Sequence, residues 1–270
     1  MTVSTADIHA VESLLAFWAA AGVDTCLSDT PIDRMAASAR PLRTALAPTR
    51  PTAVVAAAKA APDVAAAVAE AQRLASGAPD LAALAAAIAG FDGCGLKFDG
   101  ARQAVFSRGA EDAPVMIIGE GPGADEDAQG EPFVGREGKL LDRMLAAAGL
   151  EGRVFITNTV FWRPPGNRTP SATEQQVCAP FVERAIQLVQ PRMLMLVGGA
   201  SAKSLLKREE GILSMRGRWF DWHASDDSLS LPALPTLHPG FLLRQPAAKK
   251  RAWADLLTLT ERLDRPARPD

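Results

Sequence analysis

The sequence predicts an α/β protein, built as a three-layer α/β/α sandwich around a four-stranded parallel sheet and preceded by an N-terminal helical and linker extension. After residue 90, short apolar runs alternate with longer segments of helical periodicity. A repeated strand–helix–strand order produces a parallel sheet whose two faces are covered by helices. The chain of 270 residues, 48% apolar and 22% charged, is long and apolar enough for one main domain with an accessory segment.

The individual elements are predicted from local patterns in chain order. Apolar residues at helical spacing predict a short amphipathic helix over residues 7–21. Residues 40–88 are rich in alanine and interrupted by prolines, which indicates a flexible linker with one or two weak helices. Four apolar runs predict buried strands: VMIIG at 115–119, VFITN at 154–158, MLMLVG at 193–198 and ALPTL at 233–237. Helical periodicity predicts helices over residues 137–149, 172–190, 200–206 and 246–263.

Composition limits the class of protein and its partners. The formal net charge of -2 provides no basic field over the whole molecule, so a nucleic acid would have to be held by a local basic patch. Residues 1–25 lack the pattern of a signal peptide, and no apolar stretch reaches the roughly 18 residues that a membrane span needs. We expect a cytoplasmic protein without a membrane partner. Cys26, Cys94 and Cys178 are too few and too scattered for a disulfide framework.

The first predicted strand is followed by a glycine-rich loop that carries acids, GEGPGADEDAQGEPFVG at 119–135. Ligands of parallel sheets bind beyond the carboxyl ends of the strands. The glycine spacing matches neither the dinucleotide fingerprint nor the P-loop, and carboxylates repel phosphate, so the loop suits a neutral ligand or a water. Glu120 can polarise a water, and Phe133 offers a flat face for stacking. From this loop alone, solvated acids and a core phenylalanine explain the pattern equally well.

Polar groups at the ends of two further predicted strands favour a ligand. The Asn158 side chain has one acceptor and two donors, which can pair with an imide edge such as that of uracil. His238 can donate a hydrogen bond to a developing oxyanion. Leu242 and Arg244 then place an apolar wedge beside a phosphate-seeking guanidinium. Each feature alone also has a structural explanation, but all of them lie at one edge of the predicted sheet.

Several long motifs resemble the uracil-DNA glycosylase superfamily, and family 4 most of all. They are GEGPGADEDAQGEPFVGREGKLLDRML, ITNTVFWRPPGNRTPSATE, LVGGASAKSLL, RGRW and TLHPGFLLRQPAAKK. The resemblance covers residues 90–260 and not 1–88, so we expect a glycosylase-like domain at 89–265 after an extension at 1–88. It implies an α/β/α sandwich with a four-stranded parallel sheet. It also implies an enzyme that hydrolyses the N-glycosidic bond of deoxyuridine in DNA, releasing uracil and leaving an abasic site.

The resemblance also assigns roles to single residues. By it, Glu120 helps to handle the attacking water, Phe133 stacks on the flipped uracil and Asn158 reads the uracil edge. His238 stabilises the negative charge that develops on uracil O2, and Leu242 fills the gap left in the base stack.

The residue that activates the water is left open by the resemblance. Gly121 stands where other enzymes of the superfamily have an aspartate, so Glu126 is a second candidate for the water's base. The expected DNA contacts come from basic residues near the site: Arg163, Arg168, Arg244, Lys249 and Lys250. For the two lysines, a solvated helix face is slightly favoured over a contact with DNA.

The cysteines depart from the family pattern. Family 4 enzymes typically hold a [4Fe-4S] cluster with four thiolates, and Cys94 and Cys178 match the second and fourth of these. Phe91 and Trp162 stand at the other two positions, and neither side chain can ligate iron. Cys26 lies in the dissimilar extension and would leave a cluster one thiolate short. We therefore expect no iron–sulfur cluster and no other cofactor or metal, with Phe91 and Trp162 as an apolar plug.

Three other functions compete with turnover on uracil-containing DNA by a monomeric enzyme. One is a protein on the same fold that binds uracil-DNA or abasic DNA without turnover. Another is covalent trapping through a histidine near the R-P-P loop, but WRPPGNRTPSATE has no histidine. Of the other histidines, His9 lies beside the apolar stripe of the first predicted helix, and His223 lies in a segment typical of a surface turn. The third is a nucleotide-binding α/β protein without DNA activity. Strand preference, activity on other deaminated bases and the role of residues 1–88 are left open.

Overall fold

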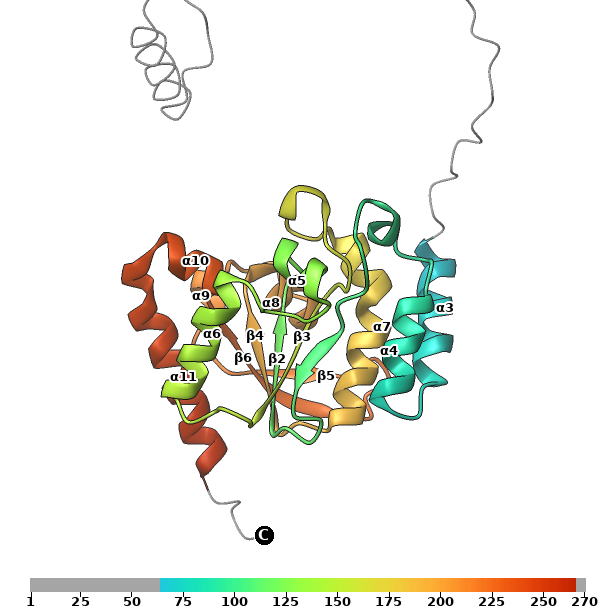
Figure 1. Cartoon of the computed structure of the whole chain (residues 1–270). Helices are drawn as coiled ribbons and strands as arrows, with labels where there is room; N and C mark the ends of the chain where they lie inside the picture. Colours follow the sequence, from blue (N-terminus) through green and yellow to red (C-terminus); the bar gives the residue numbers. More distant parts are fainter. Residues whose placement is uncertain (1–63, 266–270) are drawn as a thin grey trace, which may run out of the picture. The chain divides into compact units, whose positions relative to one another are not determined.

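The computed structural model describes residues 64–265 and contains a six-stranded sheet in the order β1-β3-β2-β4-β6-β5 (Figure 1). The strands are β1 Ser107–Gly109, β2 Val115–Gly119, β3 Val154–Asn158, β4 Met193–Val197, β5 Phe220–His223 and β6 Ser230–Thr236. The central four strands are parallel, whereas β1 and β5 pair antiparallel at the two edges. The predicted four-stranded parallel sheet is confirmed as the centre of this sheet. The two edge strands were not predicted.

Helices cover both faces of the sheet, as predicted for a three-layer sandwich. Their bounds are α3 Val64–Ser76, α4 Leu81–Gly90, α5 Ala124–Gln129, α6 Arg136–Ala147, α7 Ala172–Val189, α8 Gly199–Leu206, α9 Ile212–Met215, α10 Pro239–Arg244 and α11 Lys249–Asp264. Short 3₁₀ turns lie at η1 Gly95–Phe98, η2 Pro165–Asn167 and η3 Pro246–Ala248. In Figure 1, α3, α4 and α7 lie on one side of the sheet and α6 and α11 on the other.

Alternation along β2 shows how the sheet separates two hydrophobic cores. Met116 and Ile118 pack with the α3, α4 and α7 side, whereas Val115 and Ile117 pack with the α6 and α11 side. Successive side chains of a strand point to opposite faces, so a strand buried on both faces is a continuous apolar run. This is why the central strands could be predicted from apolar runs.

The alanine-rich segment before residue 89 is not a linker where the structure describes it. Helices α3 and α4 pack against α7, and Ala71, Leu84 and Ile88 are fully buried in the core. Asp80 caps α4 by accepting a hydrogen bond from the Ala83 amide at 2.7 Å. The one or two helices predicted in this segment are present as α3 and α4, but the flexible-linker part of the interpretation was wrong for residues 64–88. Alanine has the highest helix propensity, and its small side chain lets helices approach closely.

Other predictions for the extension fall outside the described residues. These are the helix at 7–21, His9 and Cys26. The boundary at residue 88 between an extension and a glycosylase-like domain stays a prediction.

His223 is the last residue of edge strand β5 and pairs with Ser230 of β6. The turn begins only after it, where the Ala224 amide donates to the Leu229 carbonyl at 2.9 Å. The surface-turn interpretation was thus wrong for His223 itself, because the strand FDWH is too short and polar to show a pattern. Within residues 64–265, no helix has both the length and the apolar character needed to cross a bilayer.

Candidate active site

A cavity of about 420 Å³ opens beyond the carboxyl ends of β2, β3 and β6. It brings together eight of the residues expected at the site: Glu120, Gly121, Glu126, Phe133, Asn158, Arg168, His238 and Arg244. Arg163, Leu242, Lys249 and Lys250 do not line it. Polar strand-end residues therefore meet at one edge of the sheet, where parallel sheets bind their ligands.

Asn158 ends β3 and presents an unpaired acceptor. The side chain is buried, and its Oδ1 atom has no hydrogen-bond partner among the described residues. Gly119 lies beside it in the register of β2 and β3, and a Cβ there would collide with Asn158 Oδ1. A buried acceptor without a donor costs about 1–3 kcal/mol. Such an atom is arranged to accept a hydrogen bond from a bound ligand.

Phe133 provides an aromatic wall of the cavity from an unusual backbone conformation. Its φ angle is +57°, in the left-handed region that few residues other than glycine adopt. The ring centroid lies 5.7 Å from that of His238, with 37° between the planes. A Cβ at Gly138 would collide with the Phe133 carbonyl oxygen, so this position in the first turn of α6 has to be glycine.

Glu126 holds the loop that carries Phe133. Its Oε1 accepts hydrogen bonds from the amides of Val134 and Gly135, both at 3.0 Å, and its Oε2 accepts one from the Gly123 amide at 3.1 Å. Both oxygens are therefore engaged by backbone N–H groups. This arrangement fits a positioning residue better than the water-activating base.

His238 is arranged as a neutral hydrogen-bond donor. The Gly240 amide donates to its Nδ1 at 3.2 Å, which leaves the proton of the neutral imidazole on Nε2. Burial, and next the charge of Arg244, lower the pKa of His238 to about 4. At neutral pH the ring is therefore uncharged and can donate from Nε2.

Glu120 leaves β2 and turns toward the N-terminus of α8. Its Oε1 accepts a hydrogen bond from the Ala200 amide at 3.0 Å. A Cβ at Gly198 would collide with this carboxylate. Burial raises the pKa of Glu120, and the amides of Ala200 and Gly199 oppose the shift. Glu120 is thus a partly buried carboxyl group inside the cavity, held by a helix N-terminus.

Sequence reasoning missed Glu137, which also lines the cavity. Its Oε2 lies 3.5 Å from His238 Nδ1, and a Cβ at Gly240 would collide with its Oε1. Burial raises the pKa of Glu137, as do the charges of Glu126 and Glu120, while Arg244 lowers it. The sequence feature that could have identified Glu137 is its position two residues after the glycine-rich loop, in the first turn of α6.

Leu242 does not occupy the position that a wedge in DNA requires. It is fully buried and packs in a cluster with Leu140, Leu237 and Ala252. The predicted wedge role is therefore wrong for this arrangement, because a wedge has to project from the surface. On the same helix, α10, it is Arg244 that is exposed and lines the cavity.

The arginines of the R-P-P loop are engaged with their own loop. Arg168 makes two hydrogen bonds to Glu174, at 2.9 and 2.6 Å, and Arg163 donates to Asn167 Oδ1 at 2.7 Å. Glu174 also accepts from the Ser171 amide at 2.7 Å, which caps α7. These contacts favour a loop-ordering role over free phosphate contacts. Lys249 and Lys250 are exposed at the start of α11.

The Glu174 contacts predict a pH-dependent contribution to stability. Its hydrogen bond with Arg168 is the main reason that the pKa of Glu174 falls to about 2 from an ordinary 4.5. A depressed carboxyl pKa stabilises the fold above the unfolded value and stops doing so as pH falls from about 4.5 toward 2. We expect wild type to melt at a higher temperature than Glu174→Gln at pH 7, with the difference shrinking below pH 4.5. Thermal melts of both proteins from pH 7 to pH 3 measure it, and a constant difference would contradict this origin.

Phe91, Cys94, Trp162 and Cys178 lie in one buried hydrophobic cluster. The interaction of the two thiols, together with burial, raises the pKa of Cys178, and the same interaction is the main reason that the pKa of Cys94 is lowered. Phe91 packs edge-on against Phe181 with centroids 5.2 Å apart. Residues 64–265 contain no group of three or more side chains suited to hold a metal ion. Two thiols, a phenyl ring and an indole that cannot ligate iron do not fit a four-thiolate cluster.

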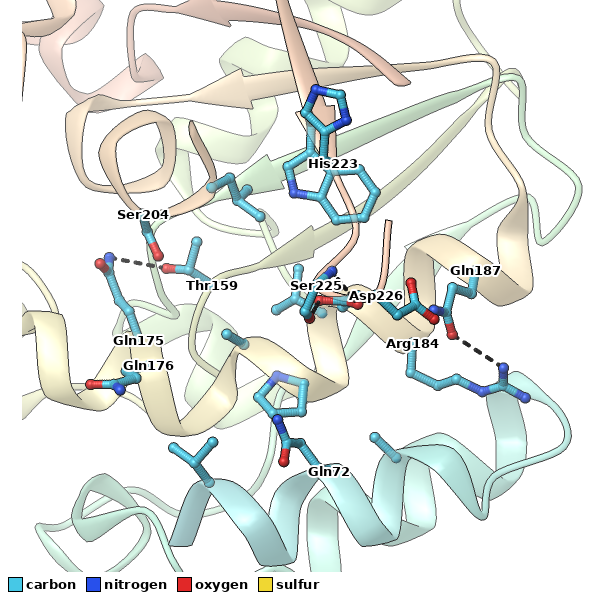
Figure 2. Close-up of a pocket in the computed structure, with 18 of the residues that line it drawn as sticks. Gln72, Thr159, Gln175, Gln176, Arg184, Gln187, Ser204, His223, Ser225 and Asp226 are labelled. Carbon is cyan, nitrogen blue, oxygen red and sulfur yellow. Dashed lines mark hydrogen bonds between the residues drawn. The ribbon is translucent and has the colours of Figure 1, made fainter. Parts of the chain in front are cut away.

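A second cavity, of about 680 Å³, lies between α3, α7, α8 and the end of β5 (Figure 2). In Figure 2, Gln175 reaches Thr159, with 3.3 Å between Nε2 and Oγ1. The Thr159 hydroxyl in turn donates to the Glu120 carbonyl at 2.6 Å. The lining of this cavity does not include Asn158, Phe133 or His238, so it is not the candidate active site.

Comparison with known proteins agrees with this geometry. The family model of the uracil DNA glycosylase superfamily matches residues 106–257. Type-4 uracil-DNA glycosylases from Pyrobaculum aerophilum, Sulfurisphaera tokodaii and Saccharolobus solfataricus are 38%, 35% and 36% identical to this chain. The matches cover 57%, 58% and 60% of this chain and 81%, 74% and 77% of the relatives. The sheet, the cavity at its carboxyl edge and these matches lead to one assignment: this chain belongs to the uracil DNA glycosylase superfamily.

Proposed function

We propose that this protein is a uracil-DNA glycosylase of DNA base excision repair. It hydrolyses the N-glycosidic bond of deoxyuridine in DNA, releases uracil and leaves an abasic site. The observation that carries the proposal is the buried, unpaired Oδ1 of Asn158 in a cavity shared with Phe133 and the neutral donor His238. The relatives named type-4 uracil-DNA glycosylases support the same reaction.

The base is recognised by its edge and its face. Asn158 Oδ1 accepts the N3–H of uracil, and the Nδ2 group of the same side chain can donate to O4. The Phe133 ring stacks on the flipped base. The base has to leave the duplex to reach these groups, which costs a few kcal/mol and least for a mispaired or single-stranded uracil. Outside the duplex the uracil edge loses its pairing partner. A pocket that offers a donor and an acceptor to this edge offsets part of that cost.

The charges that develop as the glycosidic bond breaks indicate the roles of the remaining polar side chains in the cavity. The sugar becomes cationic as the uracil leaves as an anion, so the site must stabilise both charges. The Nε2–H of His238 donates to uracil O2. Carboxylates of the cavity face the sugar, and Glu120 is the proposed group for the water because its hydrogen bond to α8 leaves it acceptor capacity. Glu126 positions the loop.

Gly121 contributes space in the proposed site. A Cβ there would lie 2.9 Å from Val160 Cγ2 and 3.2 Å from Pro170 Cγ, so a larger residue would require its neighbours to shift. An aspartate at this point would crowd the cavity.

DNA is held by basic groups around the opening. Arg244 is exposed on α10 beside the cavity and is the proposed phosphate contact closest to the flipped nucleotide. Lys249 and Lys250 extend this surface onto α11. Because each phosphate contact releases counterions, the affinity for DNA should fall steeply with salt. We also propose that the enzyme is monomeric and cytoplasmic. Analytical ultracentrifugation tests the first property and cell fractionation the second.

We further propose that this enzyme works without an iron–sulfur cluster. Phe91 and Trp162 are buried in the same hydrophobic cluster as Cys94 and Cys178 and supply no ligand. Protein purified under anaerobic conditions should contain well below one iron and one acid-labile sulfide per chain. Four of each per chain would overturn this part of the proposal.

The function is tested by time-resolved uracil release from single-stranded DNA and from duplex DNA with a U:G pair, at DNA in excess over protein. Many equivalents of uracil per protein are expected. Release that stops at one equivalent, or tight binding with no release, would instead indicate a protein that recognises uracil-DNA without turnover.

A further inference from the structure

The position of Phe133 depends on contacts outside the cavity. A non-glycine residue in the left-handed region persists only where its surroundings hold it there. Glu126 fixes the amides of Val134 and Gly135, which follow the ring. The carbonyl groups of Pro132 and Phe133 in the same loop accept hydrogen bonds from a different side chain.

Arg108 supplies that donor from edge strand β1. Its Nε donates to the Pro132 carbonyl at 2.7 Å, and its Nη2 donates to the Phe133 carbonyl at 3.2 Å. The same Nη2 lies 2.6 Å from Asp142 Oδ1 on α6. The guanidinium therefore ties β1, the Phe133 loop and α6 together through a planar, rigid fork of donors.

The environment of Arg108 favours a role in fixing the loop that carries Phe133. The Arg108 side chain is 24% exposed, so solvent weakens these contacts less than it weakens a free surface pair. Strand β1 pairs with β3, and Arg108 lies opposite Ile156, two residues before Asn158. One edge strand thus connects the strand that carries Asn158 with the loop that carries Phe133. Arg108 itself does not line the cavity.

We propose that Arg108 is a positioning residue for base capture: it holds the backbone of Pro132 and Phe133 so that the ring meets the flipped uracil. Asp142 orients the guanidinium. This inference rests on the proposed function. Arg108 acts only through the position of the Phe133 ring. Loss of Arg108 should therefore weaken uracil release from DNA that presents the base and leave the affinity for DNA without a base unchanged.

The test compares Arg108→Ala with Phe133→Ala and the double variant. Single-turnover uracil release should fall about tenfold in kcat/KM for Arg108→Ala, and adding it to Phe133→Ala should cause little further loss. Affinity for duplex DNA with a tetrahydrofuran abasic site should stay within about twofold of wild type. Arg108→Lys, which keeps one donor group, should recover part of the loss. Arg153→Ala, which removes a surface pair with Asp264 at 2.9 Å, is the matched control and should release uracil normally.

Two results for a variant with reduced activity would overturn the inference. One is an equal loss of affinity for uracil-containing and tetrahydrofuran DNA, and the other is a loss that adds fully to that of Phe133→Ala. If Arg108→Ala fails to fold, Asp142→Asn provides the same comparison with the arginine in place. Wild type that releases no uracil would defeat the proposed function, whereas normal release by both wild type and Arg108→Ala would defeat this inference alone.

Discussion

His238→Ala is expected to lower the single-turnover rate of uracil release about 10²–10³-fold with little change in DNA affinity. The side chain acts on charge that exists only in the transition state, and removal of one such donor typically has an effect of this size. The Gly240 amide fixes the neutral ring with its proton on Nε2, so the donor is prepared before DNA binds. His223→Ala is the matched control, since that ring lies at the end of β5 away from the cavity lining, and it should retain full activity.

The same histidine predicts a loss of activity in acid, at a pH below the separate loss expected from protonation of Glu120, whose pKa burial raises. Protonation at Nδ1 would displace the Gly240 hydrogen bond and pair the ring with Glu137. The pKa of His238 is lowered to about 4, so the neutral form persists well below the ordinary value of 6.5. Single-turnover rates measured from pH 8 to pH 3.5 should show the loss due to His238 near pH 4. A rate that halves near pH 6.5 and is insensitive to His238→Ala would contradict this role.

The central sheet could be predicted from the sequence because its strands are buried on both faces. Each of β2, β3 and β4 is a run of five residues without a charge, and the predicted limits agree within one residue. The edge strands lack this signal, since β1 is SRG and β5 is FDWH. The packing of α3 and α4 into the core was missed because alanine carries little amphipathic contrast, although it packs well against α7.

The site could be predicted where function is tied to a strand end. Asn158 and His238 follow apolar runs directly, so their place at one edge follows from the parallel order of the strands. Arg108 and Glu137 could not be found in this way, because their contacts join segments whose proximity only the folded chain reveals. Leu242 failed for a local reason: the short helix α10 after His238 turns this side chain into the core.

Asn158→Ala is expected to lower kcat/KM for uracil-DNA about 10²-fold and to leave the melting temperature unchanged or higher. Leaving the imide edge of uracil without its partners costs about 1–3 kcal/mol, and a factor of ten corresponds to 1.4 kcal/mol. In the free protein, however, Asn158 Oδ1 is already buried without a donor, so its removal relieves a penalty that offsets the lost packing. Stability and activity should therefore move independently at this position.

A second variant tests the same wall of the cavity without removing the amide. In Gly119→Ala, the new methyl group would collide with Asn158 Oδ1 and the Phe133 ring, so uracil release should fall while Asn158 is still present. Melting curves with free uracil separate the two effects. Uracil should raise the melting temperature of wild type and of His223→Ala but not of Asn158→Ala or Gly119→Ala. If Asn158→Ala lowered the melting temperature by several degrees and still bound uracil, the side chain would be structural, and the unpaired acceptor would not be the group that reads the base.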